Sequence, residues 1–307
     1  MENSFADALA ADRPMLLFGL TPPRATVTPE QADQIADAAL RRLEGIPLDA
    51  LVLYDLDDES DRTSEERPFP FMTMMDPTVF RSEHLSAWDK PTIIYRSVGK
   101  YTTDELTQWL RDRADGQPTV LVGASTSGKD VSTSLTTAQA LVRAERPDMP
   151  MGAVVIPERH TVKNDEHQRL ITKQEAGVRF FVSQVVYDVT AAKNMASDYV
   201  HSCRSRGITP ARVIFTISLC GSIKTLSFLQ WLGVDVPRWV QNELTHSADP
   251  LGLSVQHALD TARELRSFCD HLGLPTGFNV ESVSARKVEI EAAVHVARQI
   301  AFEMRRG

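Results

Sequence analysis

Eight short apolar runs recur along the chain, each bounded by polar or turn-forming residues. Within a run the apolar residues are continuous rather than alternating, which is typical of a parallel β-strand covered on both faces. The runs span residues 15–20, 50–55, 91–97, 119–125, 151–157, 179–187, 212–218 and 276–282. They predict eight buried parallel strands.

The segments between the runs carry the signals of amphipathic helices. Residues 29–45 begin with Pro29, whose fixed φ suits a first helical turn, and end at Gly45. Residues 191–207 end with two arginines before Gly207, which favours the negative end of the helix dipole. Residues 102–116 and 285–307 show the same periodicity.

Strands that mostly alternate with helices over about 250 to 300 residues predict a (β/α)₈ TIM barrel. A doubly wound sheet is the competing architecture, because sequence pattern alone does not close a barrel. No linker or charge break divides residues 1–307, so we expect a single domain with a long loop or lid insertion at about 56–90. In a barrel the chemistry belongs at the C-terminal ends of the strands.

Composition narrows the classes of function. The net charge of −8 argues against nucleic-acid binding, which needs a concentrated basic face. The three cysteines are widely separated, so no disulfide framework or zinc cluster is predicted. No signal-like N-terminus and no apolar run of membrane-spanning length is present, so we expect a cytoplasmic protein with no membrane partner.

Two loops contain candidate ligand-binding residues. The stretch GASTSGKD (123–130) resembles a phosphate-binding loop, but Asp130 stands where Ser or Thr would bind Mg²⁺. The acidic stretch 55–67 lacks the glycine and spacing of an EF-hand loop, so a solvated loop is favoured there. Asp55, directly after the second strand, is its member most suited to face the barrel centre.

The eight histidines show no metal-binding spacing, and no metal site is predicted. His160 is the most interesting, because it follows the fifth strand, where a barrel places its site.

Three consecutive motifs resemble the methylenetetrahydrofolate reductase family. IPERH (156–160), KQEAG (173–177) and FFVSQVVYD (180–188) are similar to that family's Y-P-E-x-H, K-x-D-A-G and T-Q-x-x-F-D. LLFGLTPPR (16–24) and VDVPRWV (234–240) resemble its F-E-F-F-P-P and I-P-x-W/L segments. The resemblance spans most of the chain in order, and it implies a (β/α)₈ barrel that binds a folate.

The resemblance also implies roles for single residues. Gln184 matches the glutamine that hydrogen-bonds the folate pterin, a task suited to an amide with both donor and acceptor. Tyr187 stands at the aromatic position of the same motif and is a second substrate-binding candidate. His160 and Lys173 match positions that contact FAD, and Ile156 stands where the family has a tyrosine beside the flavin.

Three important positions depart from the family pattern. Gly19 replaces the glutamate that acts as general acid, Ala124 replaces an aspartate that faces pterin and flavin, and Tyr95 replaces a histidine. If reduction survives, another acid is required. Glu281, at the end of the last strand and therefore beside the first in a closed barrel, is the best substitute, and Asp55 and Glu59 are next.

The expected function is reduction of 5,10-methylenetetrahydrofolate to 5-methyltetrahydrofolate with NAD(P)H, through FAD or by direct hydride transfer. Folate-dependent methyl transfer without flavin is an alternative, and so is a non-catalytic folate-binding or flavin-binding homologue. The sequence leaves open the choice between NADH and NADPH and whether the protein forms a homo-oligomer.

Overall fold

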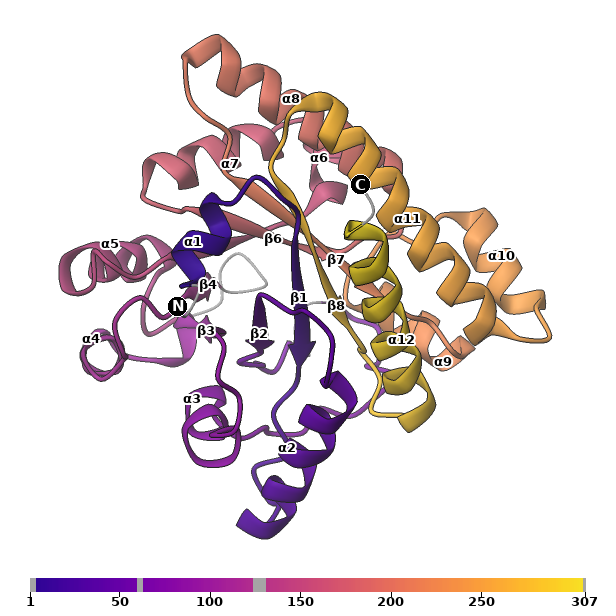
Figure 1. Ribbon diagram of the computed structural model, residues 1–307, viewed down its shortest axis with the longest axis horizontal. Helices are drawn as coiled ribbons and strands as arrows, with labels where there is room; N and C mark the ends of the chain where they lie inside the picture. The colour runs from indigo at the N-terminus through magenta and orange to yellow at the C-terminus, as the bar shows by residue number, and fades with distance from the viewer. Residues whose placement is uncertain (1–3, 60–62, 124–130, 306–307) are drawn as a thin grey trace.

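The computed structural model describes residues 4–59, 63–123 and 131–305. Its centre is a closed barrel of parallel strands in the order β1 to β8, and the helices surround it (Figure 1). The strands are β1 (Met15–Leu20), β2 (Ala50–Leu53), β3 (Thr92–Ser97), β4 (Thr119–Val122), β5 (Met151–Val155), β6 (Phe180–Val185), β7 (Arg212–Ser218) and β8 (Thr276–Glu281). The predicted (β/α)₈ barrel is confirmed, because every apolar run contains one of these strands.

The helices follow the strands in chain order. They are α1 (Phe5–Ala10), α2 (Pro29–Leu43), α3 (Pro77–Val79), α4 (Thr103–Arg111), α5 (Leu135–Glu145), α6 (Pro157–Lys163), α7 (Glu166–Glu175), α8 (Val189–Arg206), α9 (Ile223–Trp231), α10 (Arg238–His246), α11 (Pro250–Leu272) and α12 (Lys287–Met304). A π-helical turn at Phe80–His84 and a 3₁₀ turn at Val98–Lys100 complete the set. In the described part of the chain, no helix is long and apolar enough to cross a membrane.

Local sequence explains where several helices begin and end. Thr28 and Thr102 cap α2 and α4, and in both cases the residue at the third helical position returns a hydrogen bond to the cap. Asp188 caps α8 by accepting a hydrogen bond from the main-chain N–H of Ala191 at 3.0 Å, and Gly207 ends that helix in the left-handed conformation.

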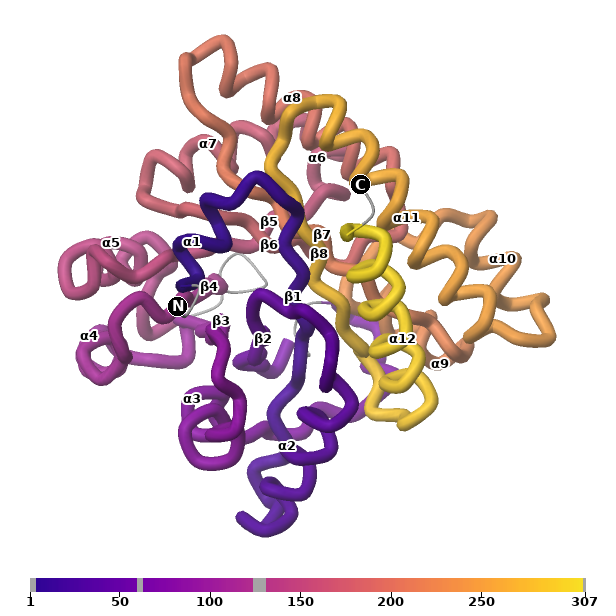
Figure 2. Tube along the Cα trace, viewed as in Figure 1, coloured from indigo at the N-terminus to yellow at the C-terminus, as the bar shows by residue number. Residues whose placement is uncertain are grey.

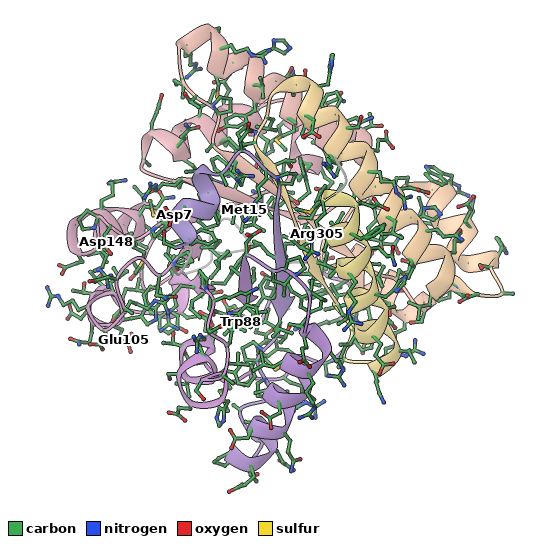
Figure 3. The ribbon with its side chains drawn as sticks, in the orientation of Figure 1. Asp7, Met15, Trp88, Glu105, Asp148 and Arg305 are labelled. Carbon is green, nitrogen blue, oxygen red and sulfur yellow. The ribbon has the colours of Figure 1, made fainter. Side chains whose placement is uncertain are left out.

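Side chains fill the barrel on both sides of the sheet (Figure 3). Alternate residues of each strand point to the axis, where they form one apolar cluster, and the others pack against the helices in a larger one. The axial cluster includes Met15, Leu17, Val52, Ile93, Val120, Phe180, Val182 and Ile214. This packed interior leaves the C-terminal mouth as the place for a site.

Helix α1, which the sequence pattern did not predict, closes the opposite end of the barrel (Figure 1). Phe5 is 1% exposed and meets Phe180 edge to face, with 5.2 Å between ring centroids. Arg212, at the start of β7, donates to the carbonyls of Leu9 and Ala11 at 3.2 and 2.6 Å and thereby holds the end of α1. The N-terminal segment is thus part of the barrel core.

We expect Phe5→Ala to lower the free energy of unfolding by about 3–5 kcal/mol, because it removes a buried ring and leaves a cavity beneath the barrel. The matched control is Phe302→Ala, since Phe302 is 52% exposed. Its effect should stay within about 0.5 kcal/mol. Chemical denaturation of both variants measures the difference, and equal small effects would show that α1 does not contribute to the core.

Candidate functional site at the barrel mouth

The mouth of the barrel is formed by inward-facing residues at the strand ends. Tyr54, Val122 and Val154 pack against the axial cluster from above and are only half-buried. Glu281 is half-buried on β8, and Gly19 lies beside it on β1. The side chains at this level are therefore reachable from the C-terminal face, as expected for a barrel site.

Glu281 and Tyr54 form the central polar contact of this mouth. The Tyr54 hydroxyl donates a hydrogen bond to Oε2 of Glu281. The same hydroxyl accepts a hydrogen bond from Nδ2 of Asn279 at 2.8 Å, and Asn279 is fully buried. Asn279 also reaches Oγ1 of Thr216 on β7 at 3.3 Å. A continuous polar network thus crosses from β7 through β8 to the end of β2.

Burial raises the pKa of Glu281 to about 7, and the hydrogen bonds from Tyr54 and Asn279 only partly oppose this. A carboxyl group with this pKa is protonated in a substantial fraction of molecules at neutral pH. It can therefore donate a proton and recover it from solvent, which is what general acid catalysis needs.

The surroundings of Gly19 explain why the candidate acid lies on β8 rather than on β1. A Cβ added at Gly19 would lie 2.8 Å from the Tyr54 hydroxyl oxygen and 3.0 Å from the Cβ of Glu281. The space that a larger side chain on β1 would enter is therefore filled by residues from its two neighbouring strands. The structure places Glu281 beside position 19, as the closed barrel predicts. Its role as an acid stays a prediction.

Asp55 occupies a different environment. Its carboxylate accepts hydrogen bonds from the main-chain N–H of Ser97 at 2.9 Å and from the Tyr101 hydroxyl at 3.0 Å, and it pairs with Lys100 at 2.5 Å. These contacts fasten the end of β2 to the connection between β3 and α4. Because these contacts engage its carboxylate, Asp55 has a structural role. The geometry therefore favours Glu281 over Asp55 as the candidate acid.

Gln184 lies at an irregularity between β6 and β7. The register runs from Val182 paired with Ile214 to Val185 paired with Thr216, so one extra residue is accommodated on β6. Such a bulge redirects side chains and is common near active sites. The Gln184 amide donates to the carbonyl of Leu232 at 3.2 Å and accepts from its neighbour's N–H at 3.3 Å. Gln184 is half-buried at the rim of the mouth, so a ligand bound there can replace these two hydrogen bonds with its own.

Tyr187 points away from this opening. It is 9% exposed, its hydroxyl donates to the carbonyl of Ser218 at 3.1 Å, and it packs in an apolar cluster that α9 and α10 share with the ends of β6 and β7. These contacts give Tyr187 a packing role at the ends of β6 and β7, and its assignment as a substrate-binding residue stays a prediction.

The residues matched to flavin contacts, together with Tyr95 as a fourth cofactor-binding candidate, are each engaged by other parts of the protein. Tyr95 is 8% exposed, and its ring meets Tyr54 edge to face at 4.9 Å. Ile156 is half-buried at the start of α6, with its N–H donated to Glu166 at 3.1 Å. His160 is 3% exposed and hydrogen-bonds Asp198 of α8 at 3.0 Å.

Lys173 is likewise occupied, because its ammonium group donates to the carbonyl of Val154 at 2.6 Å. Burial lowers its pKa to about 8, and the nearby Glu166 opposes that shift. Ala124 and the rest of the phosphate-loop-like stretch 124–130 lie outside the described residues. Lys173 and Nε2 of His160 are thus engaged by groups of the protein itself, and their assignment to FAD stays a prediction.

The long connection after β2 reaches across to α9 (Figure 2). The indole N–H of Trp231 donates to the carbonyl of Glu65 at 3.2 Å. The guanidinium carbon of Arg67 lies 5.5 Å from the ring centroid of Phe228 and 5.0 Å from that of Trp231. Leu232, which receives the hydrogen bond from Gln184, follows Trp231 directly. This connection therefore borders the same side of the mouth as Gln184.

Tyr54 and Asn279 are site residues that sequence reasoning missed. Tyr54 is the last apolar residue of the run 50–55 and therefore did not stand out as a candidate. A hydroxyl group at the end of a strand is nevertheless a signal that sequence reasoning can use. Asn279 lies two positions before Glu281 and therefore faces the same side of β8. An amide in the middle of an apolar strand is a signal that could have identified Asn279 from the sequence.

An uncharacterised protein from Clostridium thermocellum, which binds two copies of 5-methyl-5,6,7,8-tetrahydrofolic acid, is 37% identical to this chain. The match covers 97% of this chain and 98% of that chain, with a TM-score of 0.86. The chain belongs to the family of that protein.

More distant solved structures add no functional argument. A dihydropteroate synthase from Coxiella burnetii in complex with pteroic acid is 9% identical, covers 100% of this chain and 99% of its own, and has a TM-score of 0.48. No family model and no curated protein matches the chain. Membership of the methylenetetrahydrofolate reductase family itself therefore stays a prediction.

The raised pKa of Glu281 predicts a pH dependence of stability. The folded protein binds this proton more tightly than the unfolded chain does, so the contribution of Glu281 to stability falls as the pH rises from about 4.5 to about 7. We expect the free energy of unfolding of Glu281→Gln to fall less over this interval than that of the wild type. Denaturant titrations at several pH values measure it.

The exposed Glu291, on α12, supplies the control. Glu291→Gln should follow the wild-type pH dependence. Parallel curves for wild type and Glu281→Gln would show that the carboxyl group titrates normally and would remove it as a candidate acid.

Proposed function

We propose that this protein binds a reduced folate at the barrel mouth and reduces 5,10-methylenetetrahydrofolate to 5-methyltetrahydrofolate with NAD(P)H. The observation that carries the proposal is the half-buried carboxyl of Glu281, which the Tyr54 hydroxyl contacts and whose pKa is about 7. A protonatable group at the mouth of a barrel is the element that this reduction requires and that Gly19 cannot supply.

Gln184 would recognise the pterin ring. Its amide offers a donor and an acceptor together, which matches the mixed donors and acceptors of a pterin edge. The hydrogen bonds that it now makes to Leu232 and Val185 are single contacts at 3.2 and 3.3 Å. Exchange of these contacts for ligand contacts costs little net free energy, because the number of hydrogen bonds is preserved.

Glu281 would act on the folate nitrogen that leaves the methylene carbon. The proton of Glu281 passes to N10 as the bond from N10 to the methylene carbon breaks, and an iminium forms between that carbon and N5. A hydride from NAD(P)H then adds to the methylene carbon and gives the N5-methyl group. One proton and one hydride are consumed, NAD(P)⁺ is released, and the Glu281 carboxylate regains its proton from solvent.

The network behind Glu281 would hold it for this step. Tyr54 donates to the carboxyl, and Asn279 fixes the Tyr54 oxygen from below. Both partners are supplied by strands, so the carboxyl is positioned by the most rigid part of the fold. The apolar neighbours on the axis keep the group poorly solvated, which maintains its raised pKa.

The proposal uses direct hydride transfer. His160 and Lys173 are engaged with Asp198 and the carbonyl of Val154, and Tyr95 is buried against Tyr54, which supports a route without flavin. No step is therefore assigned to FAD. The nicotinamide would donate its hydride at the folate itself.

The family relative from Clostridium thermocellum supports the substrate class. It binds 5-methyltetrahydrofolic acid, which is the product of the proposed reduction. The same compound is also a methyl donor, so folate-dependent methyl transfer on this barrel is the second candidate, and a binding protein without catalysis is the third.

Folate binding is tested first, by calorimetric titration of 5-methyltetrahydrofolate. We expect Gln184→Ala to raise Kd about tenfold, because one amide carries two hydrogen bonds to the ligand. Gln108→Ala, on the exposed face of α4, should bind as the wild type does. No binding by the wild type would overturn the proposal and both of its alternatives.

Turnover is tested by oxidation of NADH or NADPH in the presence of 5,10-methylenetetrahydrofolate. We expect Glu281→Gln to lower kcat by about 100-fold or more, while folate Kd changes little, because the amide cannot donate the proton. Glu291→Gln should be unaffected. Folate binding without nicotinamide oxidation would reject reduction and leave methyl transfer or simple binding. An absorbance spectrum with a bound-flavin band would contradict direct transfer.

A further inference from the structure

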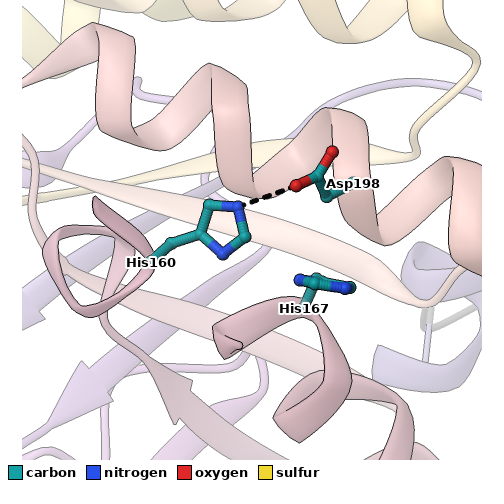
Figure 4. A group of neighbouring side chains, drawn as sticks. All are labelled: His160, His167 and Asp198. Carbon is teal, nitrogen blue, oxygen red and sulfur yellow. Dashed lines mark hydrogen bonds and ion pairs between the residues drawn. The ribbon is translucent and has the colours of Figure 1, made fainter. Parts of the chain in front are cut away.

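Two histidines and an aspartate meet in the layer of helices around the barrel (Figure 4). His160 belongs to α6, His167 to α7 and Asp198 to α8. One ligand atom from each lies within 4.8 Å of the other two, and Nε2 of His160 is 3.0 Å from Oδ2 of Asp198. The two imidazole rings meet at nearly a right angle, with 5.2 Å between their centroids.

The turn between α6 and α7 creates this arrangement. α6 ends at Asn164, which adopts the left-handed conformation with φ of 53°, and the next helix begins at Glu166. The last turn of α6 and the first turn of α7 are therefore folded together, which brings His160 beside His167. Both helices pack against α8, which contributes Asp198.

Several buried polar atoms in this corner have no hydrogen-bond partner among the described residues. They are Nδ1 of His160, Nδ1 of His167 and Oδ1 of Asp165. His160 itself is 3% exposed. A buried polar atom without a partner costs about 1–3 kcal/mol, and such groups in folded proteins usually have a function or a ligand.

The donor set has the chemistry of a transition-metal site. Two imidazole nitrogens and one carboxylate oxygen are the ligands that zinc prefers where three protein groups bind it.

We propose that His160, His167 and Asp198 bind one divalent transition-metal ion, zinc by preference, which fastens α6 and α7 to α8. The three donors leave a fourth position for water. Metal bonds of about 2.0–2.1 Å to each imidazole would draw the ligand atoms closer than the present limit of 4.8 Å, whereas the 3.0 Å separation of His160 and Asp198 already suits a shared ion. The role is structural, because the ion lies in the helix layer and Glu281 lies at the mouth.

The site would stabilise one side of the folate-binding rim. α6 starts immediately after β5, and Ile156 at that junction is held by Glu166 of α7 at 3.1 Å. An ion that joins α6, α7 and α8 would therefore restrict the connection that follows β5. Sequence spacing does not reveal the set, since its members come from three separate helices.

The test uses tag-free protein, stripped with a chelator and titrated with Zn²⁺ and with Co²⁺. We expect one equivalent of either ion to bind, the melting temperature to rise with Zn²⁺, and Co²⁺ to give the visible absorption of a low-coordinate site. His167→Gln should weaken Zn²⁺ binding at least about 100-fold. Asp198→Asn should also weaken it, although the amide can keep a hydrogen bond to His160.

His201→Gln is the matched control, because His201 is an exposed histidine on α8 outside the set. It should bind Zn²⁺ as the wild type does. Absence of a stoichiometric ion in the wild type would overturn the proposal and leave His160 and Asp198 as a simple hydrogen-bonded pair. Equal loss in His201→Gln and His167→Gln would assign the bound metal to the surface and would overturn it as well.

Discussion

Closure of the sheet between β1 and β8 is the constraint on which the mouth depends. Phe18 pairs with Val280, so the next residues along the two strands, Gly19 and Glu281, become neighbours although they come from opposite ends of the chain. This pairing puts a carboxyl group in the space that a side chain on β1 would fill. Tyr54 then enters from β2 on the other side. Without closure these three residues would share no surface.

A chain of hydrogen bonds explains how polar groups are accommodated at the mouth of this apolar barrel. The bulge on β6 frees the Ser183 hydroxyl to accept the main-chain N–H of Thr216 at 2.9 Å, and Thr216 returns a hydrogen bond to the carbonyl of Ser183 at 2.7 Å. Thr216, Asn279, Tyr54 and Glu281 continue the network across the mouth. These hydrogen bonds offset much of the cost of burying the set, although Oδ1 of Asn279 has no partner among the described residues, and within the set Glu281 and Tyr54 are the most accessible to a ligand.

The sequence predicted the barrel because continuous apolar runs report burial on both faces of a strand. It also predicted the place of Glu281, since a closed order of strands makes the first and last adjacent. It could not predict the contact with Tyr54, which depends on how far the side chains of β2 lean across the axis. It could not predict the internal contacts of Tyr187 and Asp55 for a related reason. Position near a strand end does not tell whether a side chain faces the axis or the surrounding helices.

The positions of Gly19 and Glu281 agree with the prediction from the resemblance that an acid missing from one strand of a barrel is supplied by the neighbouring strand. Inward residues at one level of adjacent strands lie within a few ångströms of each other, so a carboxyl group can move from one strand to the next and still reach the same region of the mouth. Such a move requires a small residue at the vacated position, because two side chains would otherwise overlap. Gly19 beneath Tyr54 and Glu281 meets this requirement. The loss of a glutamate on β1 is therefore compatible with retained acid catalysis, and the residue that decides it is Glu281.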